Sequence, residues 1–334
     1  MQHIKTFFLR KYNFLDDIIK IYEHFSDVYN DNSLIKNDIS YNFKEFVDFI
    51  YDNGFKNKYD YFNYTNENEK ISNNIKKEKL LLFFSGGKDS VYCALKLKEK
   101  YDVTLYFVKG INKSYPNEIE RAKECAKILD LPLVIENISL IGKTIFLENP
   151  IKNMFIYACG LNFGIDKGFG LFCLGNHKND VVSNSNFDRN FSDTYETILL
   201  FEKCINKFLE KPIKSLCLIE NYYDSVIYLG KYLEFYDVIQ SCITPHRFRN
   251  KLKEINEKKY KINLSKYDCG SCWKCCVKYV IYMDLGYIEY NKEFYKHCLK
   301  ILKAKEKTDL SDFNFIEKKE ELYELFTNGN KFFE

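Results

Sequence analysis

Short apolar runs and helical patterns alternate along the chain from residue 79 onward. Residues 79–84 form a nearly continuous apolar run, which is typical of a strand buried on both faces. A Gly-Gly loop follows, and then a helical pattern through Leu97. The alternation continues with strand patterns at 103–108, 133–135 and 170–174, and with helical patterns at 117–129 and 149–163. We therefore predict an α/β fold with a doubly wound parallel sheet, whose ligands bind at the carboxyl ends of the strands.

Helical and polar segments flank this α/β region. Aromatic residues recur at helical spacing before it, among them Phe43 and Phe46, and such stripes are typical of core or partner-facing packing. Changes in composition divide the chain into five predicted parts. These are a helical N-terminal extension at 1–63, a linker at 64–78, the α/β domain at 79–230, a cysteine-bearing subdomain at 231–290 and a C-terminal helical segment at 291–334.

Composition and charge narrow the class of protein. The 334 residues are 46% hydrophobic and carry a net charge of +3, which is ordinary for a globular protein and excludes a wholly disordered chain. A charge so near neutral does not favour a nucleic-acid binder. No run approaches the ~20 apolar residues of a membrane span, and the N-terminus lacks a secretory pattern. We expect a cytoplasmic protein with no membrane partner.

The chain has 12 cysteines, and the placement of ten of them separates these into two groups. Six stand singly in apolar surroundings, where the pattern predicts small buried side chains. These are Cys93, Cys125, Cys159, Cys173, Cys204 and Cys217. Another group is packed into residues 269–276, which indicates a metal site in a reducing compartment rather than disulfides.

The second group offers three thiolates at metal-ligand spacing. Cys269, Cys272 and Cys275 form a CxxCxxC pattern, and short CxxC loops let two thiolates reach one ion. A fourth ligand is needed, and the candidates are Cys276 and Cys242. Ligand type and spacing favour zinc, while an iron–sulfur cluster is the alternative because bacterial ferredoxins share this spacing.

A glycine-rich segment lies between the first predicted strand and the first predicted helix. Its residues are Ser85, Gly86, Gly87, Lys88, Asp89 and Ser90. Glycines let the backbone approach an anion closely, and the N–H groups at a helix N-terminus bind phosphate. Lys88 either neutralises phosphate charge or points to solvent. The structural alternative is a simple strand-to-helix turn capped by Asp89 or Ser90.

The string SGGKDS at 85–90, directly after an apolar strand, resembles the SGGxDS motif of the PP-loop N-type ATP pyrophosphatases, which have an adenine nucleotide alpha hydrolase-like fold. Members cleave ATP between its α- and β-phosphates, adenylate a substrate oxygen and let a nitrogen or sulfur nucleophile displace AMP. The resemblance implies that Ser85, Gly86, Gly87, Asp89 and Ser90 hold the pyrophosphate, with Mg²⁺ bridging the phosphates. It also implies that Phe107 and Val108, at the end of the second strand, contact adenine.

Two further segments resemble parts of this superfamily. Residues 174–180 (LGNHKND) match its acidic motifs in part, and Asp180 is the candidate for a Mg²⁺ or substrate contact. Residues 149–153 (NPIKN) resemble a VPARN-like stretch of one branch, which places Lys152 near the leaving phosphates. The candidate catalytic residues are therefore Lys88, Asp89, Lys152 and Asp180.

The cysteines indicate one particular family within this superfamily. A PP-loop segment followed by Ser241-Cys242 and then by CGSCWKC at 269–275 resembles the 7-cyano-7-deazaguanine synthase (QueC) family over roughly residues 79–285. The resemblance implies a zinc-binding subdomain whose structural zinc is held by Cys242, Cys269, Cys272 and Cys275. It also implies an AMP-forming carbon–nitrogen ligase. ATP would adenylate a carboxylate, such as 7-carboxy-7-deazaguanine of queuosine biosynthesis, ammonia would give the amide, and a second ATP would dehydrate it to the nitrile.

The sequence departs from that family at its substrate loop and its N-terminus. A GYPDCRPEF-like loop is replaced by residues 182–189, and residues 1–78 have no counterpart in the usual short enzyme. The identity of the acceptor substrate therefore stays open. One possibility is the acceptor of a QueC-like variant recruited to nucleic-acid modification or antiphage defence.

Two alternatives compete with the ligase hypothesis. A tRNA-modifying PP-loop enzyme would use the basic stretch 247–253 to contact RNA phosphates, although such runs are typically solvated helix faces. A non-catalytic nucleotide-binding module would dock a partner through residues 1–63. The expected partners are a small-molecule carboxylate and ammonia, without nucleic acid as a direct substrate. A protein partner on residues 1–63 and a homodimeric state are further hypotheses.

Overall fold

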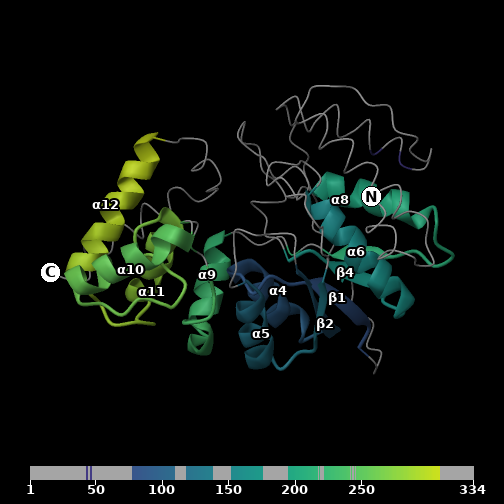
Figure 1. Cartoon of the computed structure of the whole chain (residues 1–334), viewed down its shortest axis with the longest axis horizontal. Coiled ribbons are helices and arrows are strands. Elements are labelled where there is room, and N and C mark those ends of the chain that lie inside the picture. Colours follow the sequence, from purple (N-terminus) through teal and green to yellow (C-terminus); the bar gives the residue numbers. More distant parts are fainter. Residues whose placement is uncertain are drawn as a thin grey trace. The chain divides into compact units, whose positions relative to one another are not determined.

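We describe a computed structural model of the chain. The residues described are Phe43, Phe46, 77–109, 118–137, 152–175, 195–216, 218, 222–240, 242, 244 and 246–308. The chain divides into two compact units that interleave along the sequence. Figure 1 shows the helices and strands of the chain, coloured along the sequence. The sheet unit comprises 1–84, 93–113 and 130–219, and the helical unit comprises 85–92, 114–129 and 220–334.

The sheet unit contains a five-stranded parallel sheet in the order β3-β2-β1-β4-β5. The strands are β1 (Lys79–Phe83), β2 (Asp102–Lys109), β3 (Leu133–Asn137), β4 (Leu171–Cys173) and β5 (Lys214–Leu216). The chain builds outward from β1 to one edge, then returns to the other side of β1 and builds outward again. This is the doubly wound arrangement, so the predicted α/β fold is confirmed. The reversal of strand order falls between β1 and β4, whose carboxyl ends form the switch point at which such sheets bind ligands.

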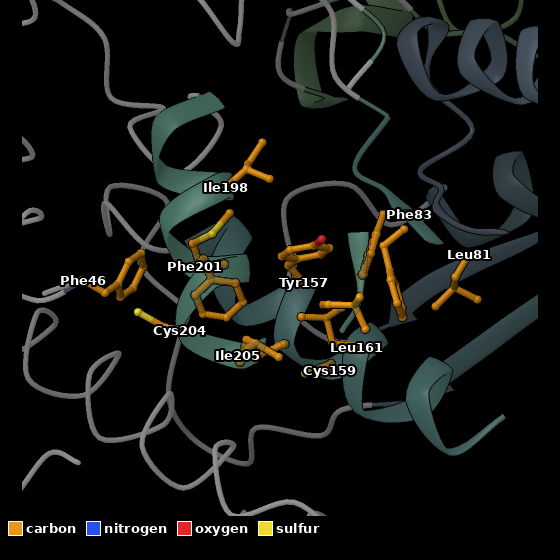
Figure 2. Close-up of a cluster of buried hydrophobic side chains, with 14 of the residues drawn as sticks. Phe46, Leu81, Phe83, Tyr157, Cys159, Leu161, Ile198, Phe201, Cys204 and Ile205 are labelled. Atoms are coloured by element: carbon orange, nitrogen blue, oxygen red, sulfur yellow. The ribbon is translucent and has the colours of Figure 1, made fainter. Parts of the chain in front are cut away.

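One face of the sheet is covered by α6 (Lys152–Asp166) and α8 (Tyr195–Asn206). Tyr157 of α6 packs its ring edge-on against Phe83 of β1, with centroids 5.1 Å apart, and its ring also contacts Phe201 of α8 (Figure 2). Helix α6 approaches the sheet closely, because a Cβ on Gly160 would lie 2.3 Å from the Phe83 ring. These contacts form the hydrophobic core of the sheet unit.

Two residues of the N-terminal region belong to this core. Phe43 and Phe46 are fully buried, and the Phe46 ring lies 5.3 Å from that of Phe201. For these two residues the predicted core packing is confirmed. The rest of the predicted N-terminal extension lies outside the described residues.

The other face of the sheet contacts the second half of α4 (Lys88–Leu97). Cys93 of α4 and Cys173 of β4 share a hydrogen bond. Cys173 is the register partner of Leu82 in β1, so these two side chains lie on the same face. Because both faces are covered, Leu80 through Phe83 are all buried, which explains the unbroken apolar run in the sequence.

The helical unit contains α5 (Glu118–Leu129), α9 (Tyr222–Gly230), the short 3-10 helix η4 (Leu233–Phe235), α10 (His246–Tyr260), α11 (Trp273–Asp284) and α12 (Lys292–Thr308). A second hydrophobic cluster joins α11 to α12: Tyr279 packs edge-on against Phe294 at 5.4 Å, and Cys298 and Leu302 are buried beside them. The same cluster includes the cysteines of residues 269–276.

The structure agrees with most of the elements predicted between residues 79 and 174 and adds others. Strand β5 and helices α8 and α9 were not predicted. The proposed domain boundaries stay a prediction. Along the described part of the chain, no helix combines the length and the apolar character needed to cross a bilayer.

Candidate functional site

The glycine-rich segment leaves β1 and enters α4 through a turn that favours glycine. Gly86 has φ +68°, in the left-handed region that side chains disfavour. A Cβ at this position would lie 2.9 Å from the backbone N and Cα of Ala122 in α5. The backbone of α5 therefore lies directly against the loop.

Protein donors hold the carbonyl groups of the first three residues of the loop. The Ser85 carbonyl accepts from Arg121 Nη2 at 3.1 Å, and the Gly86 carbonyl accepts from the Cys125 thiol at 3.7 Å. The Gly87 carbonyl accepts from the Val91 N–H at 3.0 Å. In a trans peptide the N–H points opposite to the preceding carbonyl. Holding the Ser85 carbonyl at Arg121 therefore directs the Gly86 N–H away from α5, which is the orientation that an anion-binding loop requires.

The side chains of the loop form a short polar network. Ser85 Oγ accepts from the Gly87 N–H at 3.2 Å, and Ser90 Oγ donates to the Gly87 carbonyl at 3.1 Å. Lys88 is buried, and its Nζ donates to Ser225 Oγ at 2.8 Å and to the carboxylate of Asp89. The alternative in which Lys88 points to solvent is therefore wrong.

Other predicted site residues lie near the carboxyl end of β2 or have side chains outside the described residues. Val108 packs on the same face of the sheet as Tyr106, within the hydrophobic core, while Phe107 points to the opposite face. A ligand on one face can thus contact only one of the two side chains. Lys152 begins α6, but its side chain lies outside the described residues, as does the whole of Asp180.

The predicted cysteine ligands lie together. The Sγ atoms of Cys242, Cys269, Cys272 and Cys275 are all within 4.8 Å of one another. Cys269 and Cys275 have sulfurs 4.0 Å apart, and Cys272 and Cys242 have sulfurs 3.9 Å apart. Zn–S bonds of about 2.3 Å in a tetrahedron place sulfurs roughly 3.8 Å apart, so the cluster fits such an ion. Cys242, and not Cys276, completes the set.

Several donors support a thiolate at Cys269. The backbone N–H groups of Ser271 and Cys272 lie 3.3 and 3.2 Å from Cys269 Sγ, and the Thr244 hydroxyl lies 3.1 Å from it. Hydrogen bonds from Cys242 and the other cluster thiols, together with Thr244, lower the pKa of Cys269 below the usual thiol value. A stabilised thiolate is the form that binds a metal ion.

A buried ion pair anchors the cysteine turn to α11. Asp268, which precedes Cys269, accepts from Lys278 Nζ at 2.8 Å and from the Tyr279 hydroxyl at 3.2 Å. Both charged side chains are at most 3% exposed. Burial alone would lower the pKa of Lys278, but Asp268 together with Tyr282 and Tyr236 outweighs burial and raises that pKa. The pair fixes the start of the turn because either charge alone would be costly to bury.

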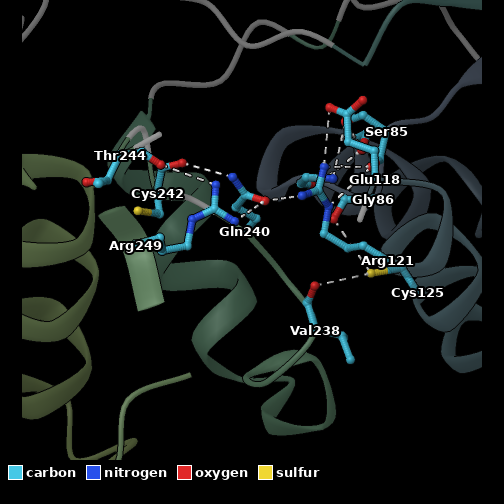
Figure 3. A network of polar contacts seen from close by, with 12 residues as sticks. Ser85, Gly86, Glu118, Arg121, Cys125, Val238, Gln240, Cys242, Thr244 and Arg249 are labelled. Atoms are coloured by element: carbon cyan, nitrogen blue, oxygen red, sulfur yellow. Dashed lines mark hydrogen bonds and ion pairs between the residues drawn. The ribbon is translucent and has the colours of Figure 1, made fainter. Parts of the chain in front are cut away.

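A polar network that the sequence did not reveal joins the loop to the cysteine cluster within the helical unit (Figure 3). Its central residue is Gln240, whose side-chain oxygen accepts from Arg121 and, at 3.4 Å, from Arg249. Both arginines are buried. Burial lowers the pKa of Arg121, and Glu118, 3.6 Å away, opposes that shift. No local pattern marks these residues, because each comes from a different segment.

The basic stretch at 247–253 forms part of α10. Arg249 points inward, where it donates to Gln240 and to the Thr244 carbonyl at 3.3 Å. Lys253 pairs with Glu257 at 3.6 Å. The stretch therefore offers fewer cations to a nucleic acid than its sequence suggests.

Comparisons with known proteins give no family assignment. No protein-family model matches the chain, and no curated protein matches it. Among solved structures, the chain is similar to a crystal structure of a predicted subunit of tRNA methyltransferase from Methanocaldococcus jannaschii. The two are 18% identical, the match covers 57% of this chain and 91% of that one, and the TM-score is 0.32. A likeness this weak supports no conclusion about function.

Proposed function

We propose that the chain is an AMP-forming, ATP-dependent carbon–nitrogen ligase of the PP-loop type, similar to 7-cyano-7-deazaguanine synthase. The observation that carries the proposal is the loop at 85–90: Gly86 is left-handed, and the carbonyls of Ser85, Gly86 and Gly87 are held by protein donors. A loop so oriented, at the N-terminus of a helix after a central strand, suits the phosphates of a nucleotide.

The proposal assigns roles to the remaining candidates. Ser85, Gly86, Gly87, Asp89 and Ser90 would hold the pyrophosphate, with Mg²⁺ bound to the phosphates. Lys88, which forms an ion pair with Asp89, would contribute its positive charge to the potential at the loop. Either Phe107 or Val108 would contact adenine. Lys152 would contact the leaving phosphates, and Asp180 would contact Mg²⁺ or the substrate.

The proposed reaction proceeds through an acyl adenylate. A carboxylate oxygen attacks the α-phosphorus of ATP and releases pyrophosphate. Ammonia then attacks the activated carbonyl carbon, loses a proton and displaces AMP to leave the amide. In the 7-deazaguanine case a second ATP adenylates the amide oxygen, and loss of AMP and a proton gives the nitrile. The chain contributes binding and orientation, which convert the encounter of the reactants into an intramolecular step.

Zinc would have a structural role in this proposal. Cys242, Cys269, Cys272 and Cys275 would hold it, and their sulfur positions fit a tetrahedral ion. A closed four-thiolate site leaves no position for substrate, so the ion supplies folding energy.

The experiment that tests the proposal supplies ATP and 7-carboxy-7-deazaguanine with and without ammonia. We expect AMP, pyrophosphate and a product whose mass corresponds to the amide or the nitrile, only when ammonia is present. AMP release that depends on added tRNA, and not on the deazaguanine acid, would favour the tRNA-modifying alternative. A chain that binds ATP but never releases AMP would be a nucleotide-binding module.

A further inference from the structure

We propose that Gln240 is a positioning residue that couples the cysteine cluster to the phosphate loop, so that a metal ion on the cysteines strengthens nucleotide binding. The inference rests on the proposed function, because it assumes that the loop binds a nucleotide. It adds to that function a means by which a distant structural site affects the nucleotide site.

Gln240 contacts the loop through its backbone and its side chain. Its carbonyl oxygen accepts from the Lys88 N–H at 3.3 Å, and Gly87 and Gln240 form a parallel β-bridge. Its side-chain oxygen accepts from Arg121, whose Nη2 also donates to the Ser85 carbonyl at 3.1 Å. Gln240 thus fixes both the entrance to α4 and the arginine that orients the Ser85 peptide.

The same side chain contacts the cysteine-bearing segment. Gln240 Nε2 donates to the Cys242 carbonyl at 3.0 Å (Figure 3). Its oxygen accepts from Arg249, which also donates to the Thr244 carbonyl. Thr244 in turn lies 3.1 Å from Cys269 Sγ through its hydroxyl. The backbone around Cys242 and the turn at Cys269 are therefore both within reach of this one amide.

The amide is well suited to this position. Two buried guanidinium groups donate to its oxygen, while its NH₂ group donates to the Cys242 carbonyl, so one amide serves as both acceptor and donor. A metal ion would tie Cys242, two residues away, to Cys269, Cys272 and Cys275. This would restrain Gln240 and, through Arg121, the loop. Since the coupling is reciprocal, a bound nucleotide should increase metal affinity by the same factor.

The reciprocal effect gives a test that does not depend on activity. Zinc-loaded, full-length protein is equilibrated with a competing chelator of known affinity, with and without saturating Mg²⁺ and α,β-methylene ATP. Nucleotide binding is measured separately by calorimetry. The variants are Gln240→Ala and Gln240→Glu. Glu keeps the acceptor for both arginines and loses the donor to Cys242. The matched control is Lys266→Ala, which removes the exposed ion pair to Glu124 of α5 at 2.9 Å but leaves the network intact.

We expect nucleotide to raise zinc affinity by about tenfold in the wild type and in Lys266→Ala, within the usual range of coupling between sites. The factor should fall to near one in Gln240→Ala. It should fall to a smaller value than in the wild type in Gln240→Glu, which loses the contact to Cys242 and keeps the one to Arg249, so this variant tests the proposal even if Gln240→Ala fails to fold. An unchanged factor in Gln240→Glu overturns the proposal, as does a factor of one in a wild type that binds the nucleotide. A wild type that does not bind nucleotide overturns the proposed function itself.

Discussion

Gly86 decides the shape of the loop at 85–90 at the level of a single residue. Its φ of +68° and the close approach of Ala122 leave no room for a side chain. Gly286 has the same φ of +68°, but no atom lies within 4 Å of its Cβ position. The two glycines therefore separate the cost of the backbone conformation from the cost of the steric conflict.

We predict that Gly286→Ala lowers the free energy of unfolding by about 1 kcal/mol, the usual cost of a left-handed residue. Gly86→Ala should cost about 3 kcal/mol, because steric overlap with the α5 backbone adds to that strain. Urea denaturation of both variants measures the difference. Equal costs would mean that α5 does not constrain the loop.

The residues of the candidate site differ in how far the sequence could identify them. The SGGKDS string and the CxxCxxC spacing are local, and both appear directly in the sequence. Spacing alone left Cys242 as one of two candidates for the fourth ligand, because 26 residues separate it from Cys269, and only the family resemblance singled it out. Arg121, Gln240 and Arg249 had no such signal, since their roles arise from contacts between segments that only folding brings together.

At the scale of the element, two features hold the cysteine turn at 268–276. These are the cluster of four thiols and the buried ion pair between Asp268 and Lys278. The cluster includes Cys242 and leaves out Cys276, which instead hydrogen-bonds with Cys298 in the core of the helical unit. Asp268 and Lys278 are buried together at the start of the turn. Metal content and stability can therefore be tested separately.

We predict one zinc per chain in the wild type and in Cys276→Ser, and none in Cys242→Ser or Cys272→Ser. Each cluster variant removes one of four ligands, whereas Cys276 is not a ligand. Metal analysis of the purified proteins gives the stoichiometry. Zinc retained in Cys242→Ser but lost in Cys276→Ser would reverse the assignment, and iron with visible absorption would indicate an iron–sulfur cluster.

We predict that Lys278→Met lowers the free energy of unfolding by about 3–5 kcal/mol, because it leaves the Asp268 carboxylate buried without its cation. The control is Lys266→Met, whose exposed pair with Glu124 should contribute less than about 1 kcal/mol. Chemical denaturation of the zinc-loaded proteins compares the two. Similar effects in both variants would contradict the structural role of the buried pair.

At the scale of the whole molecule, the fold was predictable where the apolar runs were long and belonged to strands buried on both faces. The buried runs of β1 and β2 and the alternation that follows them indicated a parallel sheet, and the strand order confirms it. Strand β5 has only three residues, which is too short for a recognisable period. The interleaving of the two units was also not predictable. The chain leaves the sheet unit after Phe84 and returns to it at Cys93, in the middle of α4, and no sequence pattern marks that point.

The central claim is that the loop after β1 directs cleavage of ATP between its α- and β-phosphates. The most direct measurement is analysis of the nucleotide products when the full chain, Mg²⁺ and ATP are incubated with 7-carboxy-7-deazaguanine and ammonia. Asp89→Asn is compared with Asp102→Asn, which changes an exposed aspartate at the amino end of β2. We predict AMP and pyrophosphate in equal amounts from the wild type and Asp102→Asn, and at least a hundredfold less from a folded Asp89→Asn, on the order of the loss expected for a group that stabilises the transition state. ADP and phosphate as the products, or AMP formation unchanged in Asp89→Asn, would contradict the account.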